Sequence, residues 1–450
     1  MQKTEGVLHV PARVMTQGRQ VIFGISLMAP IAIFGTYGVA NELSKGLLPA
    51  AYLLAFLVML ITAYSYGRMV KVYPTSGSAY GYVQKSVHPL AGFLVGWMLL
   101  LDYAFVPMLS VLFLGLALHE MLPVIPVVVW VALFIALSTF INIRGLQMAI
   151  KVNRIMVGLQ FVLIAIFFGT CIYALVSPSP GHSLLSSAPF WNPDFSMLSV
   201  IAGTALVCQS FLGFDAVTTI AEESVEPERT IPRTLIFVTI LNGIVFILIA
   251  YFGVLAYQGR SFISSDTAAV ELVEYLGGPL FETLFMLVTA ASVFTLIVSQ
   301  QAGISRLLFV MGRDRVFPEK LFCYTHPRYG TPVGGIVFIG VLTVAACMIF
   351  DLVTLASLIN LGAFVAFAFV NLCVILHYFV KRRLRTPKAV LLYLLLPVIG
   401  IGSNIWLLTS LSPQAFLVGG IWFAAGLLYL TVRTKVFTQI PDWGLFDTSL

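Results

Sequence analysis

The stretch Ser210-Phe211-Leu212-Gly213-Phe214-Asp215 interrupts an apolar run that extends from about residue 198 to residue 220. Gly213 weakens a helix, because glycine loses more backbone freedom on folding than any other residue. Asp215 places a carboxylate beside that weak point, and a charge deep in a bilayer is costly enough to suggest a function. The stretch therefore predicts a transmembrane helix that is broken halfway, with free peptide groups that face a cavity.

A second apolar run, near residues 20–42, carries a matching interruption at Ala29-Pro30, followed by Gly35 and Gly38. The two interrupted runs are the first and the sixth of the chain. Because the sixth span comes five spans after the first, and five is odd, the two enter the membrane from opposite faces. This arrangement is typical of transporters built from inverted repeats, in which broken helices mark a binding site near the bilayer midplane.

The composition excludes a water-soluble protein. Of the 450 residues, 59% are hydrophobic and only 10% are charged, and the mean hydropathy is +0.99. A soluble domain carries about 25% charged residues. Since a spanning helix needs roughly 20 apolar residues, we expect about twelve spans. They lie near residues 20–42, 48–70, 89–118, 124–142, 153–176, 198–220, 233–257, 279–308, 333–350, 354–379, 389–410 and 414–432.

The basic residues predict how these spans are oriented. If both termini are cytoplasmic, all 25 Lys and Arg except Lys45 and Arg260 fall on the cytoplasmic side, as the positive-inside rule requires. We therefore expect an all-α membrane protein with four parts. These are a cytoplasmic segment at 1–19, a core at 20–380 with repeats at about 20–176 and 198–380, two further helices within 381–433, and a cytoplasmic tail at 434–450.

Asp102 and Asp215 are the two acidic residues that lie well inside apolar spans. Asp102 can be the countercharge of a protonated amine, with the ring of Tyr103 offering a cation–π contact. Alternatively, it is a structural acid held by hydrogen bonds. Asp215 can be a gating or coupling carboxylate beside the substrate, or it can tie the sixth span to a neighbouring helix.

Glu222 and Glu223 follow at the cytoplasmic end of the sixth span. Surface charge at a helix terminus is the ordinary interpretation of such residues. The alternative is a cytoplasmic gate, in which one of them pairs with an Arg or Lys of the loop between spans two and three.

Several classes of protein leave no signal in this chain. The five cysteines show no CxxC or Cys/His spacing, and the six histidines are scattered near span ends. We therefore expect no metal, no cofactor and no nucleic-acid partner. An enzyme or a receptor is the alternative from outside transport, but neither a catalytic constellation nor a signalling domain supports it.

The chain carries two loop signatures and three span motifs. They are Tyr66-Gly67-Arg68 to Tyr82 with Gly92-Phe93 and Gly96-Trp97, Ser305-Arg306-Leu307 to Pro318 with Thr331-Pro332, Leu101-Asp102-Tyr103, Ser210 to Thr219 with Ile231-Pro232, and Asn360 to Phe367. Together these motifs resemble the amino acid–polyamine–organocation superfamily, over about residues 20–430. Within that superfamily the chain is most similar to the bacterial putrescine importers.

The resemblance implies a leucine-transporter-like fold of five plus five helices in inverted repeats, with two C-terminal helices added, that works by alternating access. It also implies where the substrate would lie, between the breaks in spans one and six. Carried over residue by residue, the lining would comprise Met28, Ala29, Pro30, Ile31, Asp102, Tyr103, Ser210, Phe211, Gly213, Phe214, Asp215 and Asn360.

Two departures from the family pattern bear on substrate and coupling. The putrescine importers carry an Asp in span one where this chain reads Phe34-Gly35-Thr36-Tyr37-Gly38. Losing that carboxylate removes a partner for one end of a dication. Some proton-driven relatives also carry a Lys in span five, at a position that we assign to Gln160. A glutamine cannot titrate, so this route for a proton is absent.

The sequence thus predicts a secondary transporter in a bacterial inner membrane. The lipid bilayer is the one partner that the composition demands. It would import a polyamine such as putrescine, or an amino acid, with H⁺ as the coupling ion and Asp215, Glu222, Glu223 and Gln160 as gating or coupling residues. The alternative within transport is a neutral amino acid permease or exchanger, which Gly35 favours. The oligomeric state is not specified.

Overall fold

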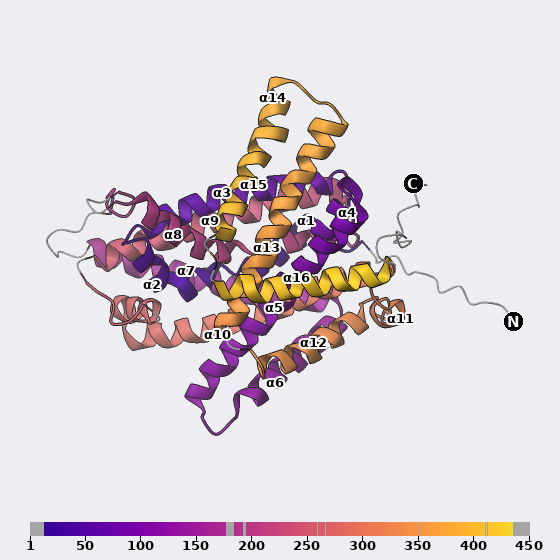
Figure 1. The fold of residues 1–450 in the computed structure, drawn as a ribbon. Helices are drawn as coiled ribbons and strands as arrows, with labels where there is room; N and C mark the ends of the chain where they lie inside the picture. The colour runs from indigo at the N-terminus through magenta and orange to yellow at the C-terminus, as the bar shows by residue number, and fades with distance from the viewer. Residues whose placement is uncertain are drawn as a thin grey trace.

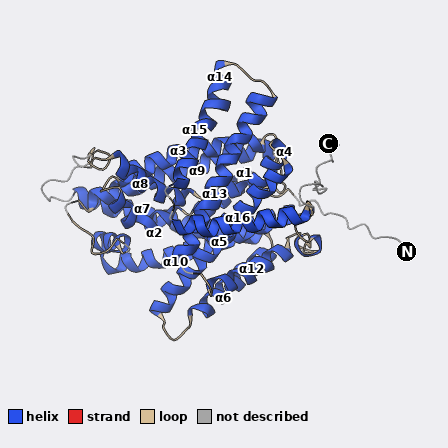
Figure 2. Cartoon of the chain, in the orientation of Figure 1, coloured by secondary structure: helices blue, strands red, loops and turns tan. Residues whose placement is uncertain are grey.

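The computed structural model describes residues 13–176, 184–191, 195–258, 260–265, 267–350, 352–409, 411 and 413–434. These residues are almost entirely helical (Figure 2), and within them the only β-type pairing is two isolated bridges, Met15 with Ser224 and Thr325 with Pro332. The first half of the chain forms α1 (Gln17–Met28), η1 (Pro30–Ala32), α2 (Ile33–Leu43), α3 (Leu48–Val70), α4 (Ser78–Ser86), α5 (Pro89–Met121), α6 (Val127–Ile143), α7 (Leu146–Val176), α8 (Met197–Val207), η2 (Cys208–Phe211) and η3 (Asp215–Ile220).

The second half continues the bundle (Figure 1). It forms α9 (Pro227–Ala256), α10 (Ala268–Arg313), α11 (Glu319–Phe322), α12 (Val333–Cys347), α13 (Leu352–Val374), η4 (Ile375–Lys381), α14 (Pro387–Val390), η5 (Leu391–Leu395), α15 (Leu396–Thr409) and α16 (Pro413–Arg433). Here η1, η2 and η3 are 3₁₀ turns, whereas η4 and η5 are π-helical turns.

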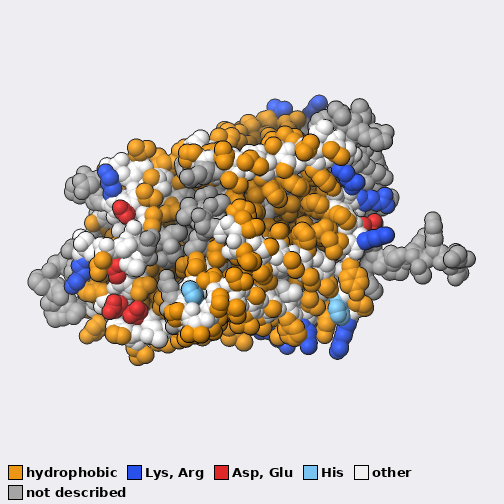
Figure 3. Space-filling view, turned by 60° about the horizontal axis from the view of Figure 1, so that its bottom comes forward, with side chains coloured by type: hydrophobic (Ala, Val, Ile, Leu, Met, Phe, Trp, Pro, Cys, Tyr) orange, Lys and Arg blue, Asp and Glu red, His pale blue; other side chains and the backbone are white. Residues whose placement is uncertain are grey.

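The membrane-spanning architecture predicted from the sequence is confirmed. Within the described residues, ten helical segments are long and apolar enough to cross a bilayer, and two shorter apolar helices, α6 and α12, complete the pattern. Figure 3 shows hydrophobic side chains over the middle of the molecule, with Lys and Arg gathered towards the end at the right. That end carries α4 and α11 in Figure 1, and we call it the basic end.

Span one is broken where the sequence predicted. The helix α1 ends at Met28, and Ala29 adopts φ 44° and ψ 96°, outside every helical conformation. Pro30 then begins the short turn η1, and α2 resumes the path. Because proline lacks an N–H group, it can start a helical turn after such a break but cannot continue one through it.

Span six is broken over a longer stretch. The helix α8 ends at Val207, Leu212 is extended, and Gly213 has a φ of 102°. A side chain at Gly213 would also meet the backbone oxygen of Leu27, 2.8 Å from its Cβ. Only glycine satisfies both conditions without strain. The chain then runs on as η3, a 3₁₀ segment, rather than the second α-helical half that the broken-helix interpretation expected.

Other differences concern helix ends. The helix α7 begins at Leu146 rather than near residue 153, and α10 begins at Ala268, with non-helical geometry at Gly278. The first extension contains Gln147 and Lys151 and the second contains Glu271, Glu274 and two glycines, so hydropathy alone could not detect them. The predicted segments 1–19 and 434–450 lie mostly outside the described residues, and the division of the core into repeats 20–176 and 198–380 stays a prediction.

The helix α5 lies at the centre of the bundle and packs against α4, α6, α10, α12, α13 and α16. Its contact with α16 is fixed by a reciprocal pair of hydrogen bonds. Trp97 Nε1 donates to the Trp422 carbonyl at 2.9 Å, and Trp422 Nε1 donates to the Trp97 carbonyl at 2.9 Å. The broken span one packs against α7, α9 and α10. These contacts bring both breaks towards the α5 and α10 faces.

Candidate functional site

A cavity of about 560 Å³ lies where the two broken spans meet α5 and α10. Its walls come from span one, α5, span six, α10 and one residue of α13. The lining residues are Leu27, Met28, Ala29, Ile31, Ala32, Gly35, Thr36, Val106, Leu109, Ser110, Phe113, Gln209, Ser210, Leu212, Thr289, Ser292, Val293, Leu296, Gln300 and Ile359.

The cavity occupies the half of the bundle that faces away from the basic end. On α5, which runs from the basic end, the wall residues extend from Val106 to Phe113. From span one the wall includes Gly35 and Thr36, which follow the break. Beyond the breaks on the basic side, the residues from Asp215 to Ile220 are all fully buried. The hollow is therefore closed towards the basic end.

The wall is apolar with a few neutral polar groups. None of the described residues that line it is charged. Three of its oxygen atoms are buried without a hydrogen-bond partner, namely Thr36 Oγ1, Thr289 Oγ1 and Gln300 Oε1. Most buried polar atoms in proteins are paired, so unpaired ones need an explanation, and a ligand is one.

A carboxylate cluster lies one helical turn from this wall. Asp215 accepts a hydrogen bond from Tyr103 Oη at 2.6 Å through Oδ2, while its Oδ1 has no partner. Tyr103 Oη also lies 3.3 Å from Ser78 Oγ of α4. The tyrosine thus connects the break in span six to α5 and to the loop helix near the basic end.

Asp102 belongs to the same cluster. It is 1% exposed, its Oδ2 has no partner, and it lies within electrostatic reach of Asp215. On α5, Asp102 precedes the wall residue Val106 by four positions, so both lie on one helix face. The helix α13 approaches this point closely, because a Cβ at Gly362 would lie 2.9 Å from the Asp102 backbone nitrogen.

The polar contact between spans one, five and eight is made by Asn153 rather than by Gln160. Asn153 Nδ2 donates to Ser26 Oγ at 2.9 Å and to Ser299 Oγ at 2.7 Å, and those two hydroxyls are 2.9 Å apart. Gln160 is also fully buried on α7, but neither its amide nitrogen nor its amide oxygen has a partner. Its role in coupling stays a prediction.

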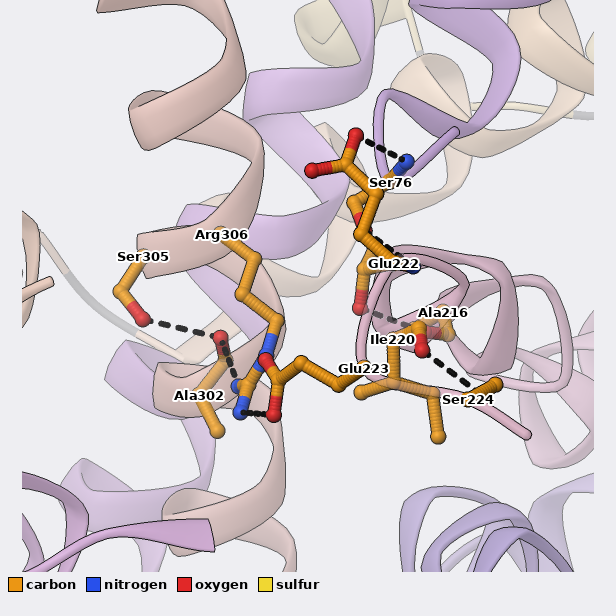
Figure 4. A network of polar contacts seen from close by, with 10 residues as sticks. Ser76, Ala216, Ile220, Glu222, Glu223, Ser224, Ala302, Ser305 and Arg306 are labelled. Atoms are coloured by element: carbon orange, nitrogen blue, oxygen red, sulfur yellow. Dashed lines mark hydrogen bonds and ion pairs between the residues drawn. The ribbon is translucent and has the colours of Figure 1, made fainter. Parts of the chain in front are cut away.

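Two ion pairs join span six to α10 at the basic end, and Figure 4 shows the one between Glu223 and Arg306. Glu223 receives hydrogen bonds from Arg306 Nε at 2.5 Å and from Arg306 Nη2 at 3.3 Å. Glu222 is paired with Arg313 through two bonds of 3.0 Å. The prediction that a partner would come from the loop between spans two and three is wrong. That loop contributes only Ser76, whose backbone nitrogen donates to Glu222 at 3.3 Å.

A further contact closes the same end. Tyr80 Oη of α4 donates to Asp314 Oδ2 at 2.7 Å, just beyond the end of α10. Burial raises the pKa of the Asp314 carboxyl above its usual value, against the opposing effects of Tyr80, Arg313 and Lys85. Burial likewise lowers the pKa of the Lys85 ammonium, against the neighbouring Asp314 charge.

The predicted lining residues therefore divide into two groups. Met28, Ala29, Ile31 and Ser210 form part of the cavity wall. The others lie beside it in this conformation, outside the wall: Pro30, Asp102, Tyr103, Phe211, Gly213, Phe214, Asp215 and Asn360. Asn360 is half-buried on α13 with its Oδ1 unpaired, next to the wall residue Ile359.

Sequence reasoning missed Gln300 and the hydroxyl groups of the wall. The polar run Ser299-Gln300-Gln301 inside an apolar span was a signal that could have identified Gln300. Among the residues that the structure describes, no three His, Cys, Asp or Glu side chains gather where they could hold a metal ion.

Comparison with known proteins identifies the family. The amino acid permease family model matches residues 20–441. The low-affinity putrescine importer PlaP of Escherichia coli (strain K12) is 38% identical over 426 residues, which cover 94% of each chain. The methylthioribose transporter of Bacillus subtilis is 26% identical over 93% of this chain and 92% of its own.

The branched-chain amino acid permease BcaP of Lactococcus lactis is also similar, with 26% identity over 92% of this chain and 93% of its own. These matches cover the broken spans, the cavity and the ion pairs at the basic end, all of which lie inside residues 20–441. The resemblance seen in the loop and span motifs is thereby confirmed, and the chain belongs to the amino acid permease family of the amino acid–polyamine–organocation superfamily.

Proposed function

We propose that this protein imports a small organic amine, either a polyamine such as putrescine or an amino acid, across a bacterial inner membrane by alternating access. Both termini would then be cytoplasmic, and the basic end would face the cytoplasm. The observation that carries the proposal is a cavity between two broken spans, next to two buried carboxyl groups. The 38% identity to a putrescine importer over nearly the whole chain supports the substrate class.

The geometry of the cavity supports import. Its wall lies in the half away from the basic end, which is closed by ion pairs between span six and α10. A substrate that enters from outside would therefore reach the broken helices before it meets the closed end. In this arrangement the closed basic end lies between the cavity and the cytoplasm. Passage of the substrate would therefore require the basic end to open.

Proton coupling through Asp102 and Asp215 is the favoured energy source. Two buried carboxyl groups lie within electrostatic reach, and none of the ion pairs in the described residues involves either of them. A bound proton or a bound ammonium group would each relieve the repulsion between two such charges. Exchange of one for the other would couple proton entry to amine transport.

A neutral amino acid permease or exchanger is the second candidate. It is favoured by the wall itself, since none of the described lining residues is charged. Similarity to branched-chain amino acid permeases is in line with this alternative. The two candidates differ in which compounds compete for uptake.

The proposal is tested by uptake into proteoliposomes with the Asp102→Asn variant. Removing a charge that a cationic substrate approaches should cost roughly 1.5–3 kcal/mol, or about 10–100-fold in putrescine uptake at low concentration. Glu228→Gln, an exposed acid at the start of α9, is the matched control and should retain uptake. Unchanged uptake by Asp102→Asn would reject the role of Asp102. Competition by leucine but not by putrescine would favour the second candidate.

A further inference from the structure

Two adjacent glutamines on α10 have opposite environments although both are buried. Gln301 is fully satisfied. Its Oε1 receives hydrogen bonds from Ser138 Oγ at 2.5 Å and from Asn142 Nδ2 at 3.1 Å. Its Nε2 donates to Thr139 Oγ1 at 2.8 Å and to the Ile336 carbonyl at 3.2 Å. Gln301 thus joins α10 to α6 and α12, and its role is structural.

Gln300 is 2% exposed, lines the cavity, and leaves its Oε1 without a partner. Its amide nitrogen lies against the break in span six, because a Cβ built on Gly213 would be 3.2 Å from Gln300 Nε2. The α10 residues on the wall run in successive turns from Thr289 to Gln300. Gln300 is the last of them before the basic end, so it lies at the floor of the cavity.

An unpaired buried acceptor selects a particular kind of ligand. Leaving it without a donor costs free energy, which a ligand N–H group can restore. An ammonium group offers three donors and no acceptor, so it fits an amide oxygen, whereas a carboxylate would be repelled. The two acids beside the floor, Asp102 and Asp215, add a negative potential that favours the same group.

We propose that Gln300 Oε1 accepts a hydrogen bond from a protonated primary amine of the substrate and is the residue that specifies this group. The inference rests on the proposed function and deepens it. The rest of the substrate would extend along the apolar wall formed by Val106, Leu109 and Leu296. Gln300 would hold the amine at the floor, against Gly213, which precedes Asp215 by two residues.

The opposite part of the cavity differs in chemistry. Thr36 Oγ1 and Thr289 Oγ1 are its unpaired buried oxygens, and both are neutral hydroxyl groups. Hydroxyl groups bind neutral donors and acceptors as well as charged ones. The site therefore requires one ammonium group, at the floor, and tolerates an uncharged polar group at the other end.

The first experiment uses the unmodified protein. Uptake of labelled putrescine into proteoliposomes is measured in competition with mono-N-acetylputrescine and with N,N′-diacetylputrescine. The mono-acetyl compound keeps one ammonium group and should compete within a few-fold of putrescine. The diacetyl compound has none and should compete at least tenfold less well, as expected for a lost hydrogen bond to a charged group. Equal competition by all three compounds would overturn the inference.

The second experiment compares the two neighbouring glutamines. Gln300→Leu should raise the half-saturating putrescine concentration about tenfold or more. It should leave the thermal midpoint of the unliganded protein unchanged or higher, because an unsatisfied buried oxygen is removed. Putrescine should raise the midpoint of the unmodified protein, and at the same concentration it should raise that of Gln300→Leu much less. Gln301→Leu should do the reverse, lowering the midpoint while the half-saturating concentration of the folded protein stays within about twofold.

The outcomes separate the inference from the proposed function. Unmodified protein that takes up neither putrescine nor labelled leucine would overturn both. If the unmodified protein transports and Gln300→Leu keeps the same half-saturating concentration for the transported compound, only the inference is wrong. Gln300→Asn keeps the amide on a shorter side chain and should fall between the two, which guards against a loss that reflects misfolding alone.

Discussion

The two ends of the bundle are held together by different chemistry. At the basic end, span six is tied to α10 by Glu223–Arg306 and Glu222–Arg313. In the opposite half, Phe34 packs edge-on against Phe167 and Phe285, with ring centroids 5.3 and 4.9 Å away. The contacts at the basic end are ionic, and those around Phe34 are aromatic. The first lie beyond the break in span six, and the second lie beyond the break in span one.

The two kinds of contact differ in what it costs to open them into water. An ion pair that opens into water recovers much of its lost hydration, so it can break at modest cost when a path to water appears. An aromatic contact gains nothing from water and is opened against the hydrophobic effect. The basic end is therefore suited to a gate that switches, and the Phe34 cluster to a contact that stays packed.

Glu223→Gln should have the largest effect, on the rate of hydrogen exchange at the basic end. The Arg306 side chain is only 9% exposed and would lose its countercharge, at a cost of roughly 3 kcal/mol. Two backbone bonds cross this end, from Met15 N to the Glu223 carbonyl and from Val225 N to the Met15 carbonyl. Hydrogen exchange of these amides should become about 100-fold faster, as mass spectrometry can measure.

Glu222→Gln provides a graded comparison for that experiment. The Glu222 and Arg313 side chains are 20% and 34% exposed, so losing their pair should cost only about 1 kcal/mol. Amides in the middle of α9 should not change in either variant. Equal exchange at Met15 and Val225 in the unmodified protein and in Glu223→Gln would show that the ion pair does not hold this end closed.

Phe34→Leu should act on the opposite half and have a smaller effect. Leucine keeps the side chain apolar but loses two edge-to-face contacts, together worth about 1–2 kcal/mol. Exchange should rise roughly tenfold in α2 while the Met15 and Val225 amides stay protected. Phe237→Leu, on the exposed face of α9, is the control. Faster exchange of the Met15 and Val225 amides in Phe34→Leu would mean that the basic end and the Phe34 contacts do not open independently.

The fold was largely predictable because bilayer physics leaves strong traces in a sequence. Hydropathy located the apolar centre of every span, and proline and glycine located both breaks. It failed where polar residues extend a helix, as Gln147 and Lys151 do in the first turns of α7. The 3₁₀ course of residues 215–220 was also hidden, because local sequence does not report how tightly a backbone is wound once it is packed.

The site was predicted less completely. Residues beside the breaks, such as Met28 and Ser210, line the cavity because the break itself defines it, and their contact with substrate stays a prediction. Which faces of α5 and α10 line it could not be deduced, since both helices are apolar on nearly every side. The partner of Glu223 was missed because the search for one was confined to the loop between spans two and three, whereas Arg306 lies near the end of the eighth span.

Asp314→Asn should have the smallest effect on stability. It tests whether titration of the Asp314 carboxyl contributes to the pH dependence of the thermal midpoint. Because burial raises the pKa of the Asp314 carboxyl in the folded state, the folded protein binds this proton more tightly than the unfolded chain does. This contribution to stability is present at acidic pH and is lost as pH rises through the raised pKa. Asparagine cannot titrate, so the thermal midpoint of Asp314→Asn should fall less between acidic and neutral pH than that of the unmodified protein.

Tyr80→Phe removes the hydrogen bond that opposes the rise in the Asp314 pKa, so it should steepen the pH dependence of the thermal midpoint. Identical pH profiles for all three proteins would mean that Asp314 stays solvated, and that closure of the basic end depends on the two ion pairs without help from this carboxyl.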